Sequence, residues 1–179
     1  MWVLPVLGAL LLLALAPSPA AASATDCAPL SSRTCAMPFP NDQNHTVADR
    51  RSATGRRVRL SPRAMPRNKD GKPIAVTEHN RNDGFSPGQP IIVKVPGLAS
   101  DRAARRSKLP RLDDLASYAA RDAGVVVLDA RTRRRHPVWA ELDANARRAS
   151  DRTLAIHPAR NFRPGRRYIV VLRNLRRAD

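Results

Sequence analysis

The chain of 179 residues has few cysteines, few lysines and few aromatic residues: two cysteines, four lysines and 4% aromatic side chains. The shortage of aromatic rings argues against a platform for single-stranded nucleic acid, because such platforms stack successive bases on aromatic side chains. The four histidines are scattered, without the spacing of zinc ligands. We therefore expect no metal site, no cofactor and no sequence-specific nucleic-acid interface.

Arginine, in contrast, is abundant. The chain has 28 arginines, and its formal net charge is +17. Such a field favours polyanions, whether nucleic acid, an acidic cell-wall polymer or anionic lipid. The densest cluster predicts a polyanion contact at Arg131, Arg133, Arg134 and Arg135. A solvated hairpin tip, or the amino-acid bias of a GC-rich genome, would explain the same residues, and a charge excess alone does not indicate base readout.

The first 24 residues read as a secretory signal peptide. Val3 to Ala16 is an almost unbroken apolar run, and Ala22-Ser23-Ala24 supplies small residues for cleavage. The run of about 14 residues is shorter than the roughly 20 that a spanning helix needs, so no membrane span is expected after cleavage. The sequence therefore predicts a secreted bacterial protein, with association to the cell wall as a further option.

The two cysteines, Cys27 and Cys35, lie close together at the start of the expected mature chain. Export would place them in an oxidising compartment, which favours a disulfide between them. Its small loop would fasten the N-terminal segment and add about 2 to 3 kcal/mol to stability.

The composition divides the mature chain near residue 90. Residues 25–90 are rich in turn-forming residues and predict an extended, loop-rich segment with a weak strand at Val58 to Leu60. Residues 91–179 contain short β-rich runs separated by turns, the spacing of an all-β sandwich. The predicted strands are Ile91 to Val95, Val125 to Asp129, Val138 to Leu142, Thr153 to Ile156 and Tyr168 to Leu172.

The predicted fold is an immunoglobulin-like antiparallel sandwich that lacks its last strand. One short helix is expected within Leu112 to Ala123, capped by Asp113 or Asp114. The strands Val125 to Asp129 and Val138 to Leu142 are expected to form a hairpin across the basic cluster. Tyr168 opens a strand after a Pro-Gly corner, which predicts that its hydroxyl makes a structural hydrogen bond back to the corner backbone.

One motif imitates a hydrolase. Gly84-Phe-Ser86-Pro87-Gly88 matches the Gly-x-Ser-x-Gly pattern of a nucleophile elbow. The residue after the serine must donate a backbone N–H to the oxyanion hole, and Pro87 has none. A chain order of Ser86, an aspartate and His136 or His157 can be drawn, but no elbow would hold a triad together. We therefore interpret this segment as a turn that leads into the strand at Ile91, and we expect no catalytic residue.

Three phrases carry a resemblance to known proteins: Cys35-Ala-Met-Pro-Phe-Pro-Asn-Asp42, Thr54-Gly-Arg-Arg-Val58 and Asn82-Asp-Gly-Phe-Ser-Pro-Gly-Gln-Pro-Ile91. They resemble the N-terminal region of large secreted actinobacterial proteins and, more distantly, the N-terminal domain of the bacterial virulence-factor lipase family. The resemblance implies a non-catalytic accessory module that precedes an α/β-hydrolase domain, its expected partner. Two alternatives remain: a basic exported protein that binds acidic polymers of the envelope, and a truncated gene product without independent function.

Overall fold

Antiparallel strands make up most of the regular structure in the part of the chain that the computed structural model describes, residues 37–62, 65 and 67–178. The helices are few and short, so the fold is all-β, as predicted. None of the described helices is long and apolar enough to cross a membrane. The predicted signal peptide and both cysteines lie outside the described residues.

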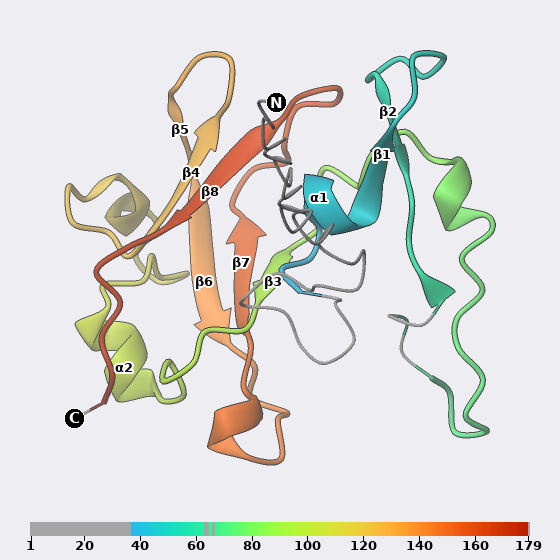
Figure 1. Cartoon of the computed structure of the whole chain (residues 1–179). Coiled ribbons are helices and arrows are strands. Elements are labelled where there is room, and N and C mark those ends of the chain that lie inside the picture. The colour runs from blue at the N-terminus through green and yellow to red at the C-terminus, as the bar shows by residue number, and fades with distance from the viewer. Residues whose placement is uncertain (1–36, 63–64, 66, 179) are drawn as a thin grey trace, which may run out of the picture.

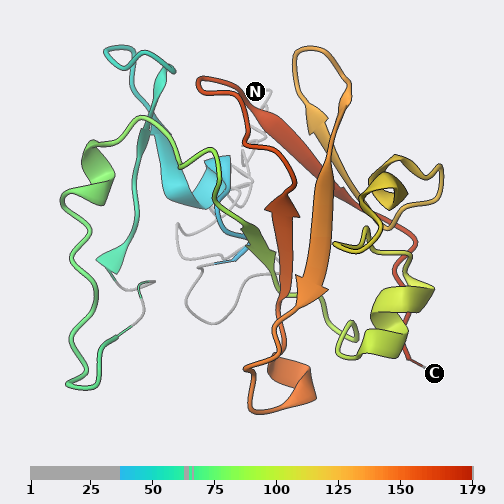
Figure 2. The ribbon, with the colours of Figure 1, turned by 180° about the vertical axis from the view of Figure 1, so that it is seen from behind.

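Two three-stranded antiparallel sheets form the centre of the molecule (Figure 1). One has the order β3-β7-β6 and the other has the order β5-β4-β8. In Figure 1, β8 crosses in front of β6, and in the view from behind in Figure 2 β6 lies in front of β8. Their bounds are Ile91–Val93 (β3), Val125–Asp129 (β4), Arg135–His136 (β5), Val138–Leu142 (β6), Leu154–Pro158 (β7) and Tyr168–Leu172 (β8).

The main core is built from alternate residues of both sheets. In each strand these side chains point to one face, because successive residues of a strand face opposite ways. The largest fully buried ones are Leu154 and Ile156 of β7 and Val125 and Val127 of β4. The remaining strand residues of this core are Ile91, Val93 and Val138. The shared apolar core therefore holds the two sheets together.

A short helix, α2 (Asp101–Arg106), packs beside this core. The Ser100 hydroxyl accepts the backbone N–H of Ala103 and caps the helix. Ala103 is fully buried, while Arg105 and Arg106 in the last turn of α2 are exposed. The 3-10 turns of the described chain include η2 (His79–Arg81) in the N-terminal part, and η3 (Leu115–Ala119) and η4 (Ala149–Asp151) in this half of the molecule.

A smaller N-terminal unit lies to the side of the sheets in Figure 1. It contains α1 (Asp42–His45) and a hairpin of β1 (Thr46–Ala48) with β2 (Arg56–Val58). A second apolar cluster of Val58, Leu60 and Val76 lies beneath it, with Phe39 and Phe85 packed against the cluster. Phe39 also exchanges two backbone hydrogen bonds with Ile92 of β3, at 2.8 and 2.7 Å. This pair of hydrogen bonds ties the N-terminal unit to the sheets.

The predicted strands were largely confirmed. Three of them, Val125 to Asp129, Val138 to Leu142 and Tyr168 to Leu172, have the predicted bounds, whereas the strand from Ile91 ends earlier, at Val93. The strand at Thr153 is shifted to Leu154–Pro158. The weak strand expected at Val58 ends there instead, as β2. Runs of β-branched residues therefore located the strands well.

The predicted hairpin across the basic cluster was wrong. β4 pairs with the two-residue strand β5, while β6 pairs with β7 in the other sheet. Pro137 separates β5 from β6, and because proline has no N–H to donate, the ladder with β4 ends at His136. The chain therefore changes sheets at this proline.

The predicted helix was also wrong in kind. Within Leu112 to Ala123 the chain forms only the 3-10 turn η3, and its N-cap residue, Asp114, makes no side-chain capping bond. Asp113 instead forms an ion pair with Arg111. Leu112 and Leu115 are 61% and 42% exposed, so their helical spacing does not reflect a buried helix face.

Candidate anion-binding site

A recess of about 430 Å³ opens between the β4–β5 hairpin and the turn that joins β7 to β8. Four arginines line it: Arg134, Arg135, Arg160 and Arg163. Among the described residues that line it, Asp129 at the end of β4 supplies the only carboxylate. The recess therefore concentrates positive charge that comes from two separate segments of the chain.

Arg135 is held in place at the base of the recess. Its Nη1 donates to the carbonyl oxygens of Tyr118 and Ala120, at 3.1 and 2.7 Å. These bonds use two of the five N–H donors of the guanidinium group. The other donors are left for a ligand, and the side chain loses little further freedom when it binds one.

The other three arginines of the recess form no ion pair with a described residue. Arg134, Arg160 and Arg163 are exposed, and in the described part of the chain none of them lies within 4.0 Å of a carboxylate. Charged side chains that already form ion pairs give up that interaction when they bind an anion. Within the described chain, these three arginines have no such interaction to give up.

The Asp129 carboxylate binds the hairpin backbone and forms no ion pair with the arginines of the recess. Its Oδ1 accepts the backbone N–H groups of Arg131 and Thr132, both at 2.9 Å. The N–H of Thr132 is the main reason that the pKa of Asp129 lies below its usual value. The carboxylate shapes the tip of the hairpin, which presents the neighbouring arginines.

An aromatic cluster supports the floor of the recess. His136, Phe162 and Tyr168 pack with ring centroids 4.5 to 5.2 Å apart. The Nε2–H of His136 donates to the carbonyl oxygen of Arg160 at 2.6 Å. Burial is the largest cause that lowers the pKa of His136, so the ring is neutral at pH 7 and acts as a structural donor. This cluster fixes the backbone that carries Arg160 and Arg163.

Tyr168 makes the hydrogen bond predicted for it. Its hydroxyl oxygen accepts the backbone N–H of Arg163 at 3.0 Å. The phenolic proton is then free to be donated elsewhere, and Tyr168 is one of the residues that line the recess. The tyrosine therefore holds the turn and offers an additional donor to an anion.

We expect Tyr168→Phe to lower the free energy of unfolding by about 1 kcal/mol, the usual net worth of a neutral hydrogen bond. Urea unfolding of the purified chain measures the change. Tyr118→Phe is the matched control, because no hydrogen bond of the Tyr118 hydroxyl occurs among the described residues. Equal losses in the two variants would contradict a specific role for the Tyr168 hydroxyl.

A second buried histidine makes stability depend on pH. His45 is 2% exposed, and its Nδ1 accepts the backbone N–H of Asn41 at 3.1 Å. Burial lowers the pKa of His45, as it does for His136. Unfolded histidine titrates near 6.5, so below about that pH the unfolded chain binds more protons than the folded chain. The stabilisation is fully present above this pH and is lost as the pH falls toward the folded pKa values.

The free energy of unfolding is therefore expected to decrease from neutral pH to about pH 5. Urea unfolding across this range measures the slope. His45→Gln should flatten it, because glutamine does not titrate, whereas replacement of the exposed His79 by glutamine should leave the slope unchanged. A slope that is the same in all three proteins would rule out His45 as its source.

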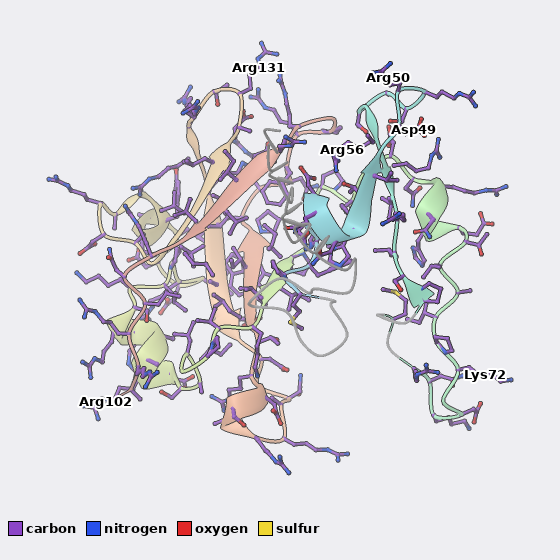
Figure 3. The ribbon with its side chains drawn as sticks, viewed as in Figure 1. Asp49, Arg50, Arg56, Lys72, Arg102 and Arg131 are labelled. Carbon is purple, nitrogen blue, oxygen red and sulfur yellow. The ribbon has the colours of Figure 1, made fainter. Side chains whose placement is uncertain are left out.

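The predicted polyanion residues divide into two groups. Arg134 and Arg135 line the recess, whereas Arg131 and Arg133 do not. Figure 3 shows Arg131 extending from the hairpin tip into solvent. Arg160 and Arg163 were not predicted from the sequence; their signal was the basic composition of the turn around Pro164-Gly165, which was interpreted only as a corner.

The hydrolase-like motif forms the turn that was predicted. The backbone N–H of Gln89 donates to the carbonyl oxygen of Ser86 at 3.1 Å, which places Pro87 and Gly88 at the centre of the turn. Among the described residues, no hydrogen bond joins the Ser86 side chain to a histidine. His136 bonds to Arg160, and His157 stacks on Trp139 with ring centroids 3.9 Å apart.

The described residues contain no group of three or more histidine, cysteine, aspartate or glutamate side chains that could hold a metal ion. Comparison of the chain with family models, with curated proteins and with solved structures gave no match. The function must therefore be argued from the site itself.

Proposed function

We propose that this chain is a non-catalytic module that binds polyanions, with the arginine-lined recess as its main contact. The observation that carries the proposal is the convergence of Arg134, Arg135, Arg160 and Arg163 around one cavity that has a single carboxylate in its lining. Arginine favours phosphate, sulfate and carboxylate groups, because its planar guanidinium offers paired donors to two oxygens.

The surrounding surface supports a polymer more than a small anion. Arginine side chains project from many of the loops in Figure 3, and Arg131 and Arg133 extend the positive surface to the hairpin tip. A polymer would gain affinity from many such contacts by releasing its condensed counterions. An acidic polymer of the bacterial envelope fits both this charge and the signal-like N-terminal sequence.

As part of the same proposal, the module acts as an accessory to a larger secreted protein. The resemblance to the N-terminal region of secreted hydrolases supports this, as does Ser86, which lies in a turn with no histidine bonded to it among the described residues. In that setting the module would hold a neighbouring domain close to an anionic surface. The chemistry would belong to the neighbour.

Binding of a fluorescent heparin fragment, measured by anisotropy at a series of salt concentrations, tests this function. We expect the logarithm of the association constant to fall linearly with the logarithm of salt concentration. The double variant Arg134→Glu/Arg160→Glu should lower the affinity about tenfold and also make the salt dependence shallower.

The matched control is Arg50→Glu/Arg102→Glu, which changes the net charge equally at two exposed arginines away from the recess (Figure 3). We expect it to lower the affinity by less than about threefold. Equal losses in the two double variants would show that the charge acts diffusely and would overturn the recess as the binding site.

A further inference from the structure

β8 is an open sheet edge in a molecule whose other sheet edges are short or covered. The edge of β3 exchanges two hydrogen bonds with Phe39, and on the edge of β6 the N–H of Ala140 donates to Pro110 at 2.8 Å. The edge strand β5 has only two residues. β8 has five residues, and within the described chain no strand pairs with its outer side.

The register identifies which backbone groups point outward. The N–H of Ala130 donates to Arg167 and the N–H of Arg173 donates to Gly124, so these are hydrogen-bonded pairs of the β4–β8 ladder. Hydrogen-bonded and non-hydrogen-bonded pairs alternate in an antiparallel ladder. The N–H and C=O groups of Tyr168, Val170 and Leu172 therefore point away from β4, and no hydrogen bond to them occurs among the described residues.

The side chains of β8 are apolar on both faces. Tyr168 and Leu172 pack against the main core, whereas Ile169 and Val170 are 44% and 36% exposed. Natural proteins usually protect a free edge with charged residues or proline inside the strand. β8 has neither between Tyr168 and Leu172, so it offers both the hydrogen bonds and the apolar surface that an added strand needs.

Positive charge flanks this strand. Arg167 precedes β8 and Arg173 follows it. The Arg173 guanidinium donates to the carbonyl oxygens of Arg121 and Ala123, which fix its position, and within the described chain no carboxylate lies within 4.0 Å of it. Arg167 lies 2.9 Å from the carboxylate of Asp42 and is exposed. Both ends of the edge therefore carry an arginine; a partner carboxylate at Arg167 would share that guanidinium with Asp42.

A second copy of this chain fits the edge poorly. Antiparallel pairing of two β8 strands centred on Val170 would place Arg167 of each copy opposite Arg173 of the other. Like charges at directly opposed positions destabilise a sheet. A strand with carboxylates at both ends would instead form opposite-charge pairs at these two positions.

We propose that β8 binds an extended segment of a partner polypeptide, apolar at alternate positions and acidic at both ends, as an added antiparallel strand. The main-chain groups of Tyr168, Val170 and Leu172 would supply the hydrogen bonds, and Arg167 and Arg173 would select the acidic ends. This surface is distinct from the arginine-lined recess, and the proposal holds whether or not the recess binds polyanions.

The test is titration of the isotope-labelled chain with a synthetic peptide in which valine and threonine alternate between pairs of glutamates, followed by amide NMR and calorimetry. We expect the largest shifts, and slowed amide exchange, at Tyr168, Val170 and Leu172. Val170→Pro should weaken binding by about tenfold or more, because it removes the central outward N–H. The N–H of Val170 points away from β4, so proline there removes no hydrogen bond of the β4–β8 ladder. Val170→Thr keeps the N–H and should bind nearly as well.

The charge requirement has its own control. A peptide with lysines in place of the glutamates should bind at least about tenfold more weakly, and Arg167→Glu should narrow this difference. Equal affinity for the two peptides, or no binding of either, would overturn the proposal. So would a dimer seen by light scattering that becomes monomeric in Val170→Pro, because the occupant would then be a second copy.

Discussion

Replacing Gly124 by alanine is expected to lower the free energy of unfolding by about 3 kcal/mol, because a new side chain would collide with rigid backbone. A Cβ atom at this position would lie 2.0 Å from the carbonyl oxygen of Ser107. This contact cannot be relieved by a side-chain rotation. Either the segment after α2 or the start of β4 would have to move.

Such a movement would break several bonds at once. The N–H of Gly124 donates to Lys108 at 3.0 Å, and its carbonyl oxygen accepts from Arg173 at 2.9 Å. Ser107 is 1% exposed, and its Oγ accepts the N–H of Arg176. Gly124 thus lies where α2, β4 and the C-terminal segment meet.

Urea unfolding of Gly124→Ala beside Gly84→Ala measures the effect. A Cβ atom added to Gly84 would meet no other atom within 4 Å, so the same substitution there should change stability by less than about 1 kcal/mol. A loss at Gly124 no larger than that at Gly84 would mean that the close approach to Ser107 does not occur in solution.

Ile156→Ala is expected to lower the free energy of unfolding by about 3 kcal/mol, the usual effect of truncating a buried isoleucine to alanine. Ile156 is fully buried at the centre of β7, opposite Ile91 on one side and Ala140 on the other. Because strands pair with both of its edges, β7 has little freedom to close the resulting cavity. Ile156→Val should cost only about 1 kcal/mol.

The matched control for this cavity is Ile169→Ala in β8, at a side chain that is 44% exposed. Ile169→Ala should lower the free energy of unfolding by less than about 1 kcal/mol, because folding buries only part of the apolar surface of this side chain. Thermal and urea unfolding of Ile156→Ala, Ile156→Val and Ile169→Ala measure the three changes in the free energy of unfolding. Similar losses for Ile156→Ala and Ile169→Ala would contradict the division between a buried core at β7 and a solvent-facing side of β8.

The strands could be located from the sequence, but their partners could not. Val125-Val-Val-Leu-Asp129 and Tyr168-Ile-Val-Val-Leu172 are runs of β-branched and apolar residues bounded by turns, and local composition predicts such segments well. Pairing depends on residues far apart in the chain. Pro137, which ends the ladder with β4, was visible, and its lack of an N–H was the signal that the predicted hairpin could not continue.

For the helices, the prediction failed in location: a helix was expected where none forms, and α2 was not expected. Spacing of Leu112 and Leu115 predicted a helix, although both side chains are exposed and the segment forms a 3-10 turn. The helix α2 begins after Ser100, whose capping role could be expected from its residue type and from the alanine-rich segment after it. It buries little beyond Ala103, so it lacks the apolar periodicity on which the prediction depended.

Two of the four arginines of the recess could be predicted from the sequence. Arg134 and Arg135 stood out because the arginines cluster within a few positions of one chain segment. Arg160 and Arg163 reach the same recess only because β4 pairs with both β5 and β8, which brings the turn before β8 to the hairpin. Charge density along the sequence cannot reveal a convergence that the sheet creates.

The order of strands also constrains how the molecule is made. β3 leaves the ribosome before β4, β5 and β6, yet its partner in the sheet is β7. Ile91 and Val93 of β3 can pair with β7 only after residues 154–158 have been synthesised. In contrast, β1 and β2 can pair as soon as they emerge. The strands β7 and β8 come last, and one of them completes each sheet. A nascent chain that stops before Leu154 would therefore leave β3 and β6 without their sheet partner and one edge of β4 unpaired, and would be a target for aggregation or proteolysis.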